Sequence, residues 1–195
     1  MMTQLQENHY YVCENFIRAQ DCQDILNVCL DKINLQQFSE AQIGNGFQQQ
    51  SFKSIRNSNI CWIDNWHETD ALKKYTNRLH EIQLELNNYF FLSLKRFEGQ
   101  FAHYPLGGHY KKHIDQLQLT NHRQVSSILY LNNLEKGGEL VIYDKDDKNK
   151  IICQITPKAG TFVIFFSKTI YHEVLPCSED RYSLTTWFRD DLEDY

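Results

Sequence analysis

The chain has 195 residues, of which 42% are hydrophobic and 13% aromatic, and this is enough to bury the core of one soluble globular domain. Its formal net charge of −5 and its pI near 5.9 argue against a general nucleic-acid or anionic-membrane binder, because both need a dense positive surface. The start "MMTQLQENHYY" lacks the pattern of a secretory signal, and no stretch approaches the roughly 20 apolar residues that span a bilayer, so we expect a cytoplasmic protein.

Two helices are predicted in the N-terminal half. Apolar residues recur at helical spacing over about Asp21–Ile33, which predicts a first helix with one buried face. A second, longer helix is predicted to begin near Thr69 or Asp70, both good N-terminal capping residues, and to end near Phe91. Between the helices, residues 44–64 are polar and contain glycine, and they lack apolar periodicity until their last residues. We expect a mobile excursion there, followed by a short strand.

After Leu94 the sequence changes to short runs of β type, separated by polar residues, glycine or proline. Seven such runs in about 95 residues predict a sandwich or jelly roll, and two helices ahead of them would cover one sheet, which gives an α+β fold. We therefore predict one domain over residues 1–195, with helical support and a loop in 1–94 and a β core in 95–190. The predicted strands are Arg96–Tyr104, Gln124–Asn132, Glu139–Tyr143, Ile151–Ile155, Thr161–Phe166, Tyr171–Leu175 and Arg181–Phe188.

Potential metal ligands gather in "HYKKHIDQ", residues 109–116. An H-x-D motif is common by chance, but residues two apart in a strand point to the same face, so His113 and Asp115 could hold one ion. His172, in the apolar run "TIYHEVL", is a candidate third ligand, and a satisfied core histidine is the alternative. His122 lies in a polar stretch and is interpreted as a solvated loop histidine. Two imidazoles and one carboxylate form the facial triad of non-haem iron(II) oxygenases.

Arg181 opens the last predicted strand, in which Arg181, Ser183, Thr185 and Trp187 share one face by the period of two. An arginine at the start of a strand is commonly a surface charge. A buried arginine that points inward must meet a carboxylate, and its planar guanidinium suits that geometry. The sequence leaves both interpretations open.

The order His113-x-Asp115, His172 and Arg181 on a strand-rich C-terminal half resembles the 2-oxoglutarate and iron(II)-dependent dioxygenases. Within them it is most similar to the prolyl hydroxylases related to those acting on hypoxia-inducible factor. The resemblance covers roughly Ile60–Trp187 and includes "IRNSNICWID", "HYPLGGHYKKHID", "ILYLN", "GGELVIY" and "HEVLPCSEDRYSLTTWF". It implies a double-stranded β-helix, a cupin-like jelly roll, with N-terminal helices packed on one sheet.

The resemblance also implies Fe(II) as cofactor, 2-oxoglutarate and O2 as cosubstrates, and ascorbate as an optional reductant. His113, Asp115 and His172 are the implied metal ligands. Arg181 is the implied anchor for the distal carboxylate of 2-oxoglutarate, and Tyr130 would donate a hydrogen bond to that carboxylate, with a half-buried strand tyrosine as the alternative. The other implied residues are Tyr104, Thr185 and Leu140 for the cosubstrate, and Tyr110, Trp187 and Arg56 for the substrate pocket.

Substrate choice depends on Phe47–Asp64, which the resemblance identifies as a finger loop that closes over a peptide. Arg56 and Trp62 match positions of this loop; the alternatives are a solvated charge for Arg56 and a core anchor for Trp62, and we favour the core anchor. The implied function is a prolyl 4-hydroxylase of a cytoplasmic protein, with elongation factor Tu as one candidate. The alternatives are an oxygenase of the same fold that hydroxylates a small molecule and a non-enzymatic cupin-like module with a structural metal.

Overall fold

The computed structural model describes residues 1–41, 53–116 and 122–192. Helices and short strands alternate in the first part of the chain. These elements are α1 (Met2–Asn8), β1 (Tyr10–Cys13), α2 (Ala19–Asn34), β2 (Ser39–Glu40), β3 (Arg56–Asn57), β4 (Asn59–Trp62) and α3 (Asp70–Phe90).

The rest of the described chain is built from strands. They are β5 (Arg96–Tyr104), β6 (His109–His113), β7 (Arg123–Tyr130), β8 (Leu140–Tyr143), β9 (Ile151–Ile155), β10 (Phe162–Phe166), β11 (His172–Val174) and β12 (Arg181–Arg189).

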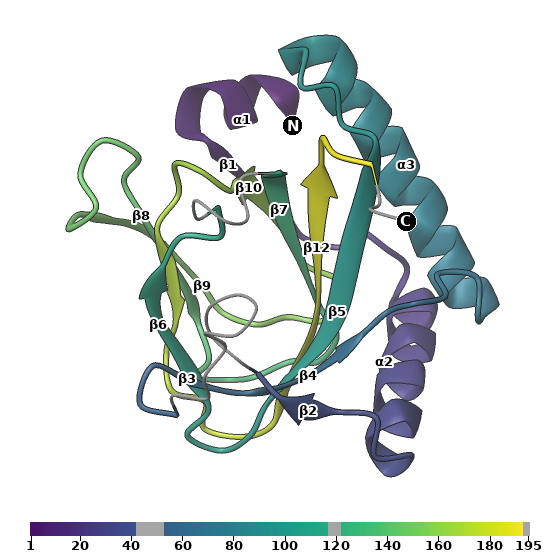
Figure 1. Cartoon of the computed structure of the whole chain (residues 1–195). Coiled ribbons are helices and arrows are strands. Elements are labelled where there is room, and N and C mark those ends of the chain that lie inside the picture. Colours follow the sequence, from purple (N-terminus) through teal and green to yellow (C-terminus); the bar gives the residue numbers. More distant parts are fainter. Residues whose placement is uncertain (42–52, 117–121, 193–195) are drawn as a thin grey trace.

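The strands form two antiparallel sheets that face each other (Figure 1). The major sheet has the order β1-β10-β7-β12-β5-β4-β2, and the minor sheet has the order β3-β6-β11-β8-β9. Buried apolar side chains from both sheets pack together in one cluster, to which β7 and β10 contribute from one side and β8 and β11 from the other. This arrangement confirms the predicted α+β fold with a double-stranded β-helix.

Helices α2 and α3 cover the outer face of the major sheet (Figure 1). Alternation along β12 explains this layering, because Leu184 and Phe188 are buried against the helices whereas Ser183 and Trp187 face the other sheet. Helix α3 begins where the sequence predicts: the Thr69 hydroxyl caps its N-terminus by accepting a hydrogen bond from the backbone of the first turn. No helix among the described residues is long and apolar enough to cross a membrane.

Several short elements were not predicted: α1, β1, β2, β3 and β6. Each is two to seven residues long, too short for a periodic pattern to stand out. Pairing with distant strands stabilises them instead, as when β1 pairs with β10 and β3 with β6. The unpredicted strand β6 matters most, because it carries the first ligand candidate.

Candidate metal and cosubstrate site

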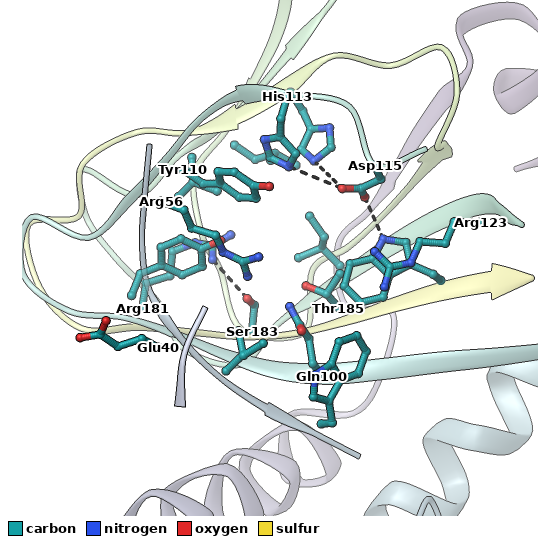
Figure 2. A pocket seen from close by; sticks show the side chains of 18 of the residues that line it. Glu40, Arg56, Gln100, Tyr110, His113, Asp115, Arg123, Arg181, Ser183 and Thr185 are labelled. Carbon is teal, nitrogen blue, oxygen red and sulfur yellow. Dashed lines mark hydrogen bonds and ion pairs between the residues drawn. The ribbon is translucent and has the colours of Figure 1, made fainter. Parts of the chain in front are cut away.

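The two candidate histidines lie opposite each other on neighbouring strands. His113 ends β6, His172 begins β11, and the antiparallel register pairs them directly. Asp115 lies in a bend just after β6, which corrects the expectation that one strand face carries both His113 and Asp115. The Nε2 atoms of His113 and His172 lie 3.5 and 3.7 Å from Oδ1 of Asp115. The structure therefore brings the three predicted ligands together, and Figure 2 shows His113 and Asp115 pointing toward each other.

Backbone carbonyls fix the orientation of both imidazoles. Nδ1 of His113 donates to the carbonyl of Lys111 at 2.9 Å, and Nδ1 of His172 donates to the carbonyl of Ile170 at 3.2 Å. Tyr110 also stacks on His113, with ring centroids 3.5 Å apart. Because each Nδ1 holds the proton, each Nε2 carries the lone pair that a metal ion needs.

Two hydrogen bonds orient the carboxylate of Asp115. Its Oδ2 accepts hydrogen bonds from Ser126 Oγ at 2.7 Å and from Trp187 Nε1 at 2.9 Å, and Oδ1 faces the two histidines. Trp187 was predicted as a pocket residue, and it also orients the carboxylate. Ser126 was missed, because a serine in a buried strand gives no sequence signal for this contact.

Electrostatics keep the site in the protonation state of a metal ligand set. Burial raises the pKa of Asp115, but His172, His113 and the Ser126 hydroxyl outweigh burial and hold this pKa well below its usual range. Burial, followed by the charge of His113, lowers the pKa of His172 to about 4. At neutral pH Asp115 is therefore a carboxylate and His172 a neutral imidazole, which are the forms that bind metal.

The spacing of these atoms fits a single metal ion. Two ligand atoms bonded about 2.1 Å from one ion can lie at most about 4.2 Å apart. Both distances from Asp115 Oδ1 fall within this limit. Two imidazoles and one carboxylate are the donor set that suits iron(II) and leaves coordination positions open.

Arg181 is buried and points inward, so it is not a surface charge. Only 1% of its surface is exposed. Its guanidinium carbon lies 4.9 Å from the ring centroids of both Tyr104 and Tyr130, and Nη1 donates to Ser183 Oγ at 3.2 Å. Among the described residues, Nε has no hydrogen-bond partner and no carboxylate forms an ion pair with Arg181. A buried cation without a counter-ion is costly, so the site is suited to an anionic ligand.

Tyr130 lies beside Arg181 and is fully buried, which excludes the half-buried alternative. Its hydroxyl has no hydrogen-bond partner among the described residues. Burial raises the pKa of Tyr130, against the opposing charge of Arg181, so the phenol stays protonated and can donate. Tyr130 does not itself line the cavity, but its ring packs against the guanidinium of Arg181, which does.

A cavity of about 330 Å³ joins the triad to Arg181. Figure 2 shows Arg181 and Ser183 across the cavity from Asp115. The predicted cosubstrate residues Tyr104, Thr185 and Leu140 all line it. Sequence reasoning did not assign a site role to several other lining residues, which are Ser39, Glu40, Ile60, Gln100, Arg123, Ile128, Val174 and Ser183.

Arg56 and Trp62, the two residues matched to the predicted finger loop, lie at the mouth of the cavity. Trp62 lines the cavity and is 44% exposed, so the interpretation as a core anchor is wrong. The short strand β4 places the side chain of Trp62 on the cavity side of the major sheet, 5.9 Å from the ring of Trp187. Arg56 lies over the ring of Tyr110 at 4.7 Å and donates to Ser58, so it is not simply a solvated charge. Within the predicted loop, residues 47–52 lie outside the described residues.

His122 does not join the triad. Its Nδ1 lies 2.8 Å from Asp190, so it is exposed but paired rather than merely solvated. Asp191 lies nearby, and these three side chains could also approach one ion. Asp191 already accepts hydrogen bonds from Arg189, however, and this second cluster lies outside the cavity.

Comparisons with known proteins agree with this geometry. The family model of the 2OG-Fe(II) oxygenase superfamily matches residues 99–189, which include the triad and Arg181. The crystal structure of a Pseudomonas putida prolyl-4-hydroxylase is 31% identical, with a TM-score of 0.86 and 96% of both chains covered. A prolyl hydroxylase from Trichoplax adhaerens, solved with a peptide fragment of the hypoxia-inducible factor oxygen degradation domain, is 26% identical. Its TM-score is 0.85, with 97% of this chain and 87% of that chain covered.

A curated plant protein is also similar. Probable prolyl 4-hydroxylase 7 of Arabidopsis thaliana is 22% identical over 91% of this chain. The present chain spans 61% of the length of that relative. The fold, the triad geometry and these similarities together place the chain in the 2OG-Fe(II) oxygenase superfamily, where it resembles the prolyl 4-hydroxylases.

Proposed function

We propose that this protein is an Fe(II)- and 2-oxoglutarate-dependent prolyl 4-hydroxylase that acts on a protein substrate. One observation carries the proposal: a single cavity holds a two-histidine, one-carboxylate cluster and, across from it, a buried arginine with no carboxylate partner among the described residues. A non-enzymatic module with a structural metal has no need for such a cation. The combination suits an open metal centre that works with an anionic cosubstrate.

His113, Asp115 and His172 would hold the iron. Bound Fe(II) supplies the activation of dioxygen, which no side chain can perform alone. The protein contributes the geometry: backbone carbonyls orient the two imidazoles, and two donors bind Oδ2 of Asp115, which leaves Oδ1 directed at the two histidines.

Arg181 would seat the distal carboxylate of 2-oxoglutarate. Its Nε and the hydroxyl of Tyr130 lack a hydrogen-bond partner among the described residues, and such a carboxylate would accept hydrogen bonds from both. Leu140 is fully buried at the cavity wall and would pack against the methylene groups, with Tyr104 and Thr185 completing the lining. A buried charge pair of this kind seats one dicarboxylate in one orientation, which is what positions it at the metal.

The mouth supports a polypeptide substrate with a target proline. Trp62 and Arg56 at the mouth pack against Trp187 and Tyr110, which also line the cavity, and such an aromatic surface suits the apolar ring of a proline. The similar Trichoplax protein was solved with a peptide in complex. Elongation factor Tu as the specific substrate rests on the family resemblance alone, and the comparisons do not add support for it.

Substrate-stimulated turnover tests the proposal. The anaerobically iron-loaded protein would receive 2-oxoglutarate and oxygen, and succinate would be measured with proline-containing peptides and with the same peptides carrying alanine for proline. We expect stimulation only by peptides that contain proline. Equal stimulation by free small molecules would favour the small-molecule oxygenase, and absence of succinate under every condition would reject the enzyme.

A further inference from the structure

Five charged side chains form a network beside the cavity, at one end of strands β5, β12 and β7. Glu98 Oε1 accepts hydrogen bonds from Arg123 Nε at 2.7 Å and from Arg189 Nη1 at 2.9 Å. Arg189 also donates to both oxygens of Asp191, at 2.8 and 2.6 Å, and Arg96 donates to Asp191 at 3.2 Å. Charges therefore alternate along the network from Arg96 to Arg123.

The network is partly buried, which makes its charges more effective than those of surface pairs. Exposed fractions of the side chains range from 15% for Arg189 to 23% for Glu98. Pairs shielded from water are screened less by salt and interact more strongly. The two arginines that Glu98 joins, Arg123 and Arg189, are also direct cross-strand partners in the sheet register. Without the carboxylate between them they would repel each other.

The cavity end of the network contacts the support of the metal site. The guanidinium of Arg123 lies over the ring of Trp187, 3.9 Å from its centroid, and Trp187 Nε1 donates to Oδ2 of Asp115 at 2.9 Å. In the register of the sheet, Trp187 lies between Glu98 on β5 and Ser126 on β7. A cation on the face of an indole draws electron density from the ring and polarises the N–H bond, which strengthens its hydrogen bond to a carboxylate.

We propose that Glu98 is a positioning residue of this site: by fixing Arg123 on the face of Trp187, it holds the indole N–H on Asp115. Glu98 does not line the cavity and makes no hydrogen bond to the triad, so it acts only through these two side chains. The consequence for Asp115 is that Oδ2 stays occupied and Oδ1 stays directed at the histidines. The expected effect of these contacts on metal binding rests on the proposed function, whereas the contacts themselves can be tested in the metal-free protein.

The indole N–H of Trp187 reports the arrangement directly in the metal-free protein. The chain has three tryptophans, so its nitrogen-15 spectrum holds three indole signals, and the variant Trp187→Phe identifies the one to follow. We expect Glu98→Gln to move this signal upfield and to speed its hydrogen exchange by about tenfold, because the weakened contact opens more often. Glu98→Asp, which retains the carboxylate, should change the chemical shift and the exchange rate less than Glu98→Gln does.

A matched control separates this effect from general loss of charge. Glu81→Gln removes a carboxylate from an exposed ion pair with Arg78 on α3, and we expect the Trp187 signal and exchange rate to stay as in the parent. An unchanged Trp187 signal in Glu98→Gln would overturn the proposal, and so would equal changes in both variants.

Anaerobic Fe(II) binding then tests the consequence. Removing an outer support of a metal ligand typically weakens metal binding 10- to 100-fold, and we expect about tenfold for Glu98→Gln because it acts through two intermediates. The effect should vanish in a Trp187→Phe background, since the proposed route runs through that indole. The proposal would be overturned if Glu98→Gln weakened Fe(II) binding as much in the Trp187→Phe background as in the parent. Failure of the parent protein to bind Fe(II) would instead reject the proposed function and leave the indole result standing.

Discussion

Replacing Arg181 by lysine should separate cosubstrate binding from metal binding. Arg181 is 1% exposed, donates one hydrogen bond to Ser183 and has an Nε without a partner among the described residues. Lysine keeps the charge but replaces the planar fork by a single ammonium group, so at least one charged hydrogen bond to the cosubstrate carboxylate is lost. Such a bond is worth about 1.5–3 kcal/mol. The Kd of 2-oxoglutarate should therefore rise roughly 10- to 150-fold.

Calorimetric titration of 2-oxoglutarate into anaerobic, iron-loaded protein measures this change. Fe(II) affinity should stay within about twofold of the parent, because no described contact joins Arg181 to the triad and lysine keeps the positive charge. Arg78→Lys is the matched control, since Arg78 is half-exposed in a surface pair and should leave both affinities unchanged. Unchanged 2-oxoglutarate affinity in Arg181→Lys would refute the assignment of Arg181 as its anchor.

Three further predictions concern Asp115 and Tyr130 in the site and Asp21 on α2. Asp115→Ala removes the only anionic ligand candidate of the triad and should abolish Fe(II) binding by calorimetry, whereas His122→Ala should bind Fe(II) like the parent. Tyr130→Phe removes a buried hydroxyl without a partner among the described residues. Urea unfolding of the metal-free protein should therefore show no loss of stability, while 2-oxoglutarate binding weakens by about 0.5–1.5 kcal/mol. A hydrogen bond from Arg18 lowers the pKa of Asp21 from 3.8 to about 2, so its contribution to stability is present above pH 3.8 and is lost as the pH falls toward 2. Asp21→Asn should cost about 1 kcal/mol at pH 7, a low value because Arg18 is largely exposed to solvent. The difference in stability between Asp21→Asn and the parent in urea unfolding should shrink as the pH falls from 3.8 toward 2.

The elements that could be predicted from the sequence are those with enough residues to show a period. Strand β5 has the predicted bounds Arg96–Tyr104, and α3 begins and ends within a residue of the prediction. Strand β6 was missed because "HYKKH" has no apolar alternation, and pairing with β3 and β11 stabilises it instead. Trp62 was misassigned because an aromatic residue in a short strand is usually buried, whereas here it faces the cavity mouth.

The site was predictable in its residue types and not in its supports. The spacing of the triad and Arg181, together with the family resemblance, identified the residues that the fold brings into one cavity. The contact of Ser126 with Asp115, and of Glu98 with Arg123, depends on the register between β5, β12 and β7. Register between strands far apart in the chain cannot be read from local patterns, because it is fixed by packing across the whole sheet.

The most direct test of the central claim is mass spectrometry of proteins from a cell extract after incubation with iron-loaded protein, 2-oxoglutarate and isotopically labelled dioxygen. We expect at least one peptide to gain a single labelled oxygen on a proline, and we expect the same extract treated with Asp115→Ala to lack that peptide. Succinate formation without any labelled proline, or labelled prolines that appear equally with Asp115→Ala, would contradict the assignment of this protein as a prolyl 4-hydroxylase.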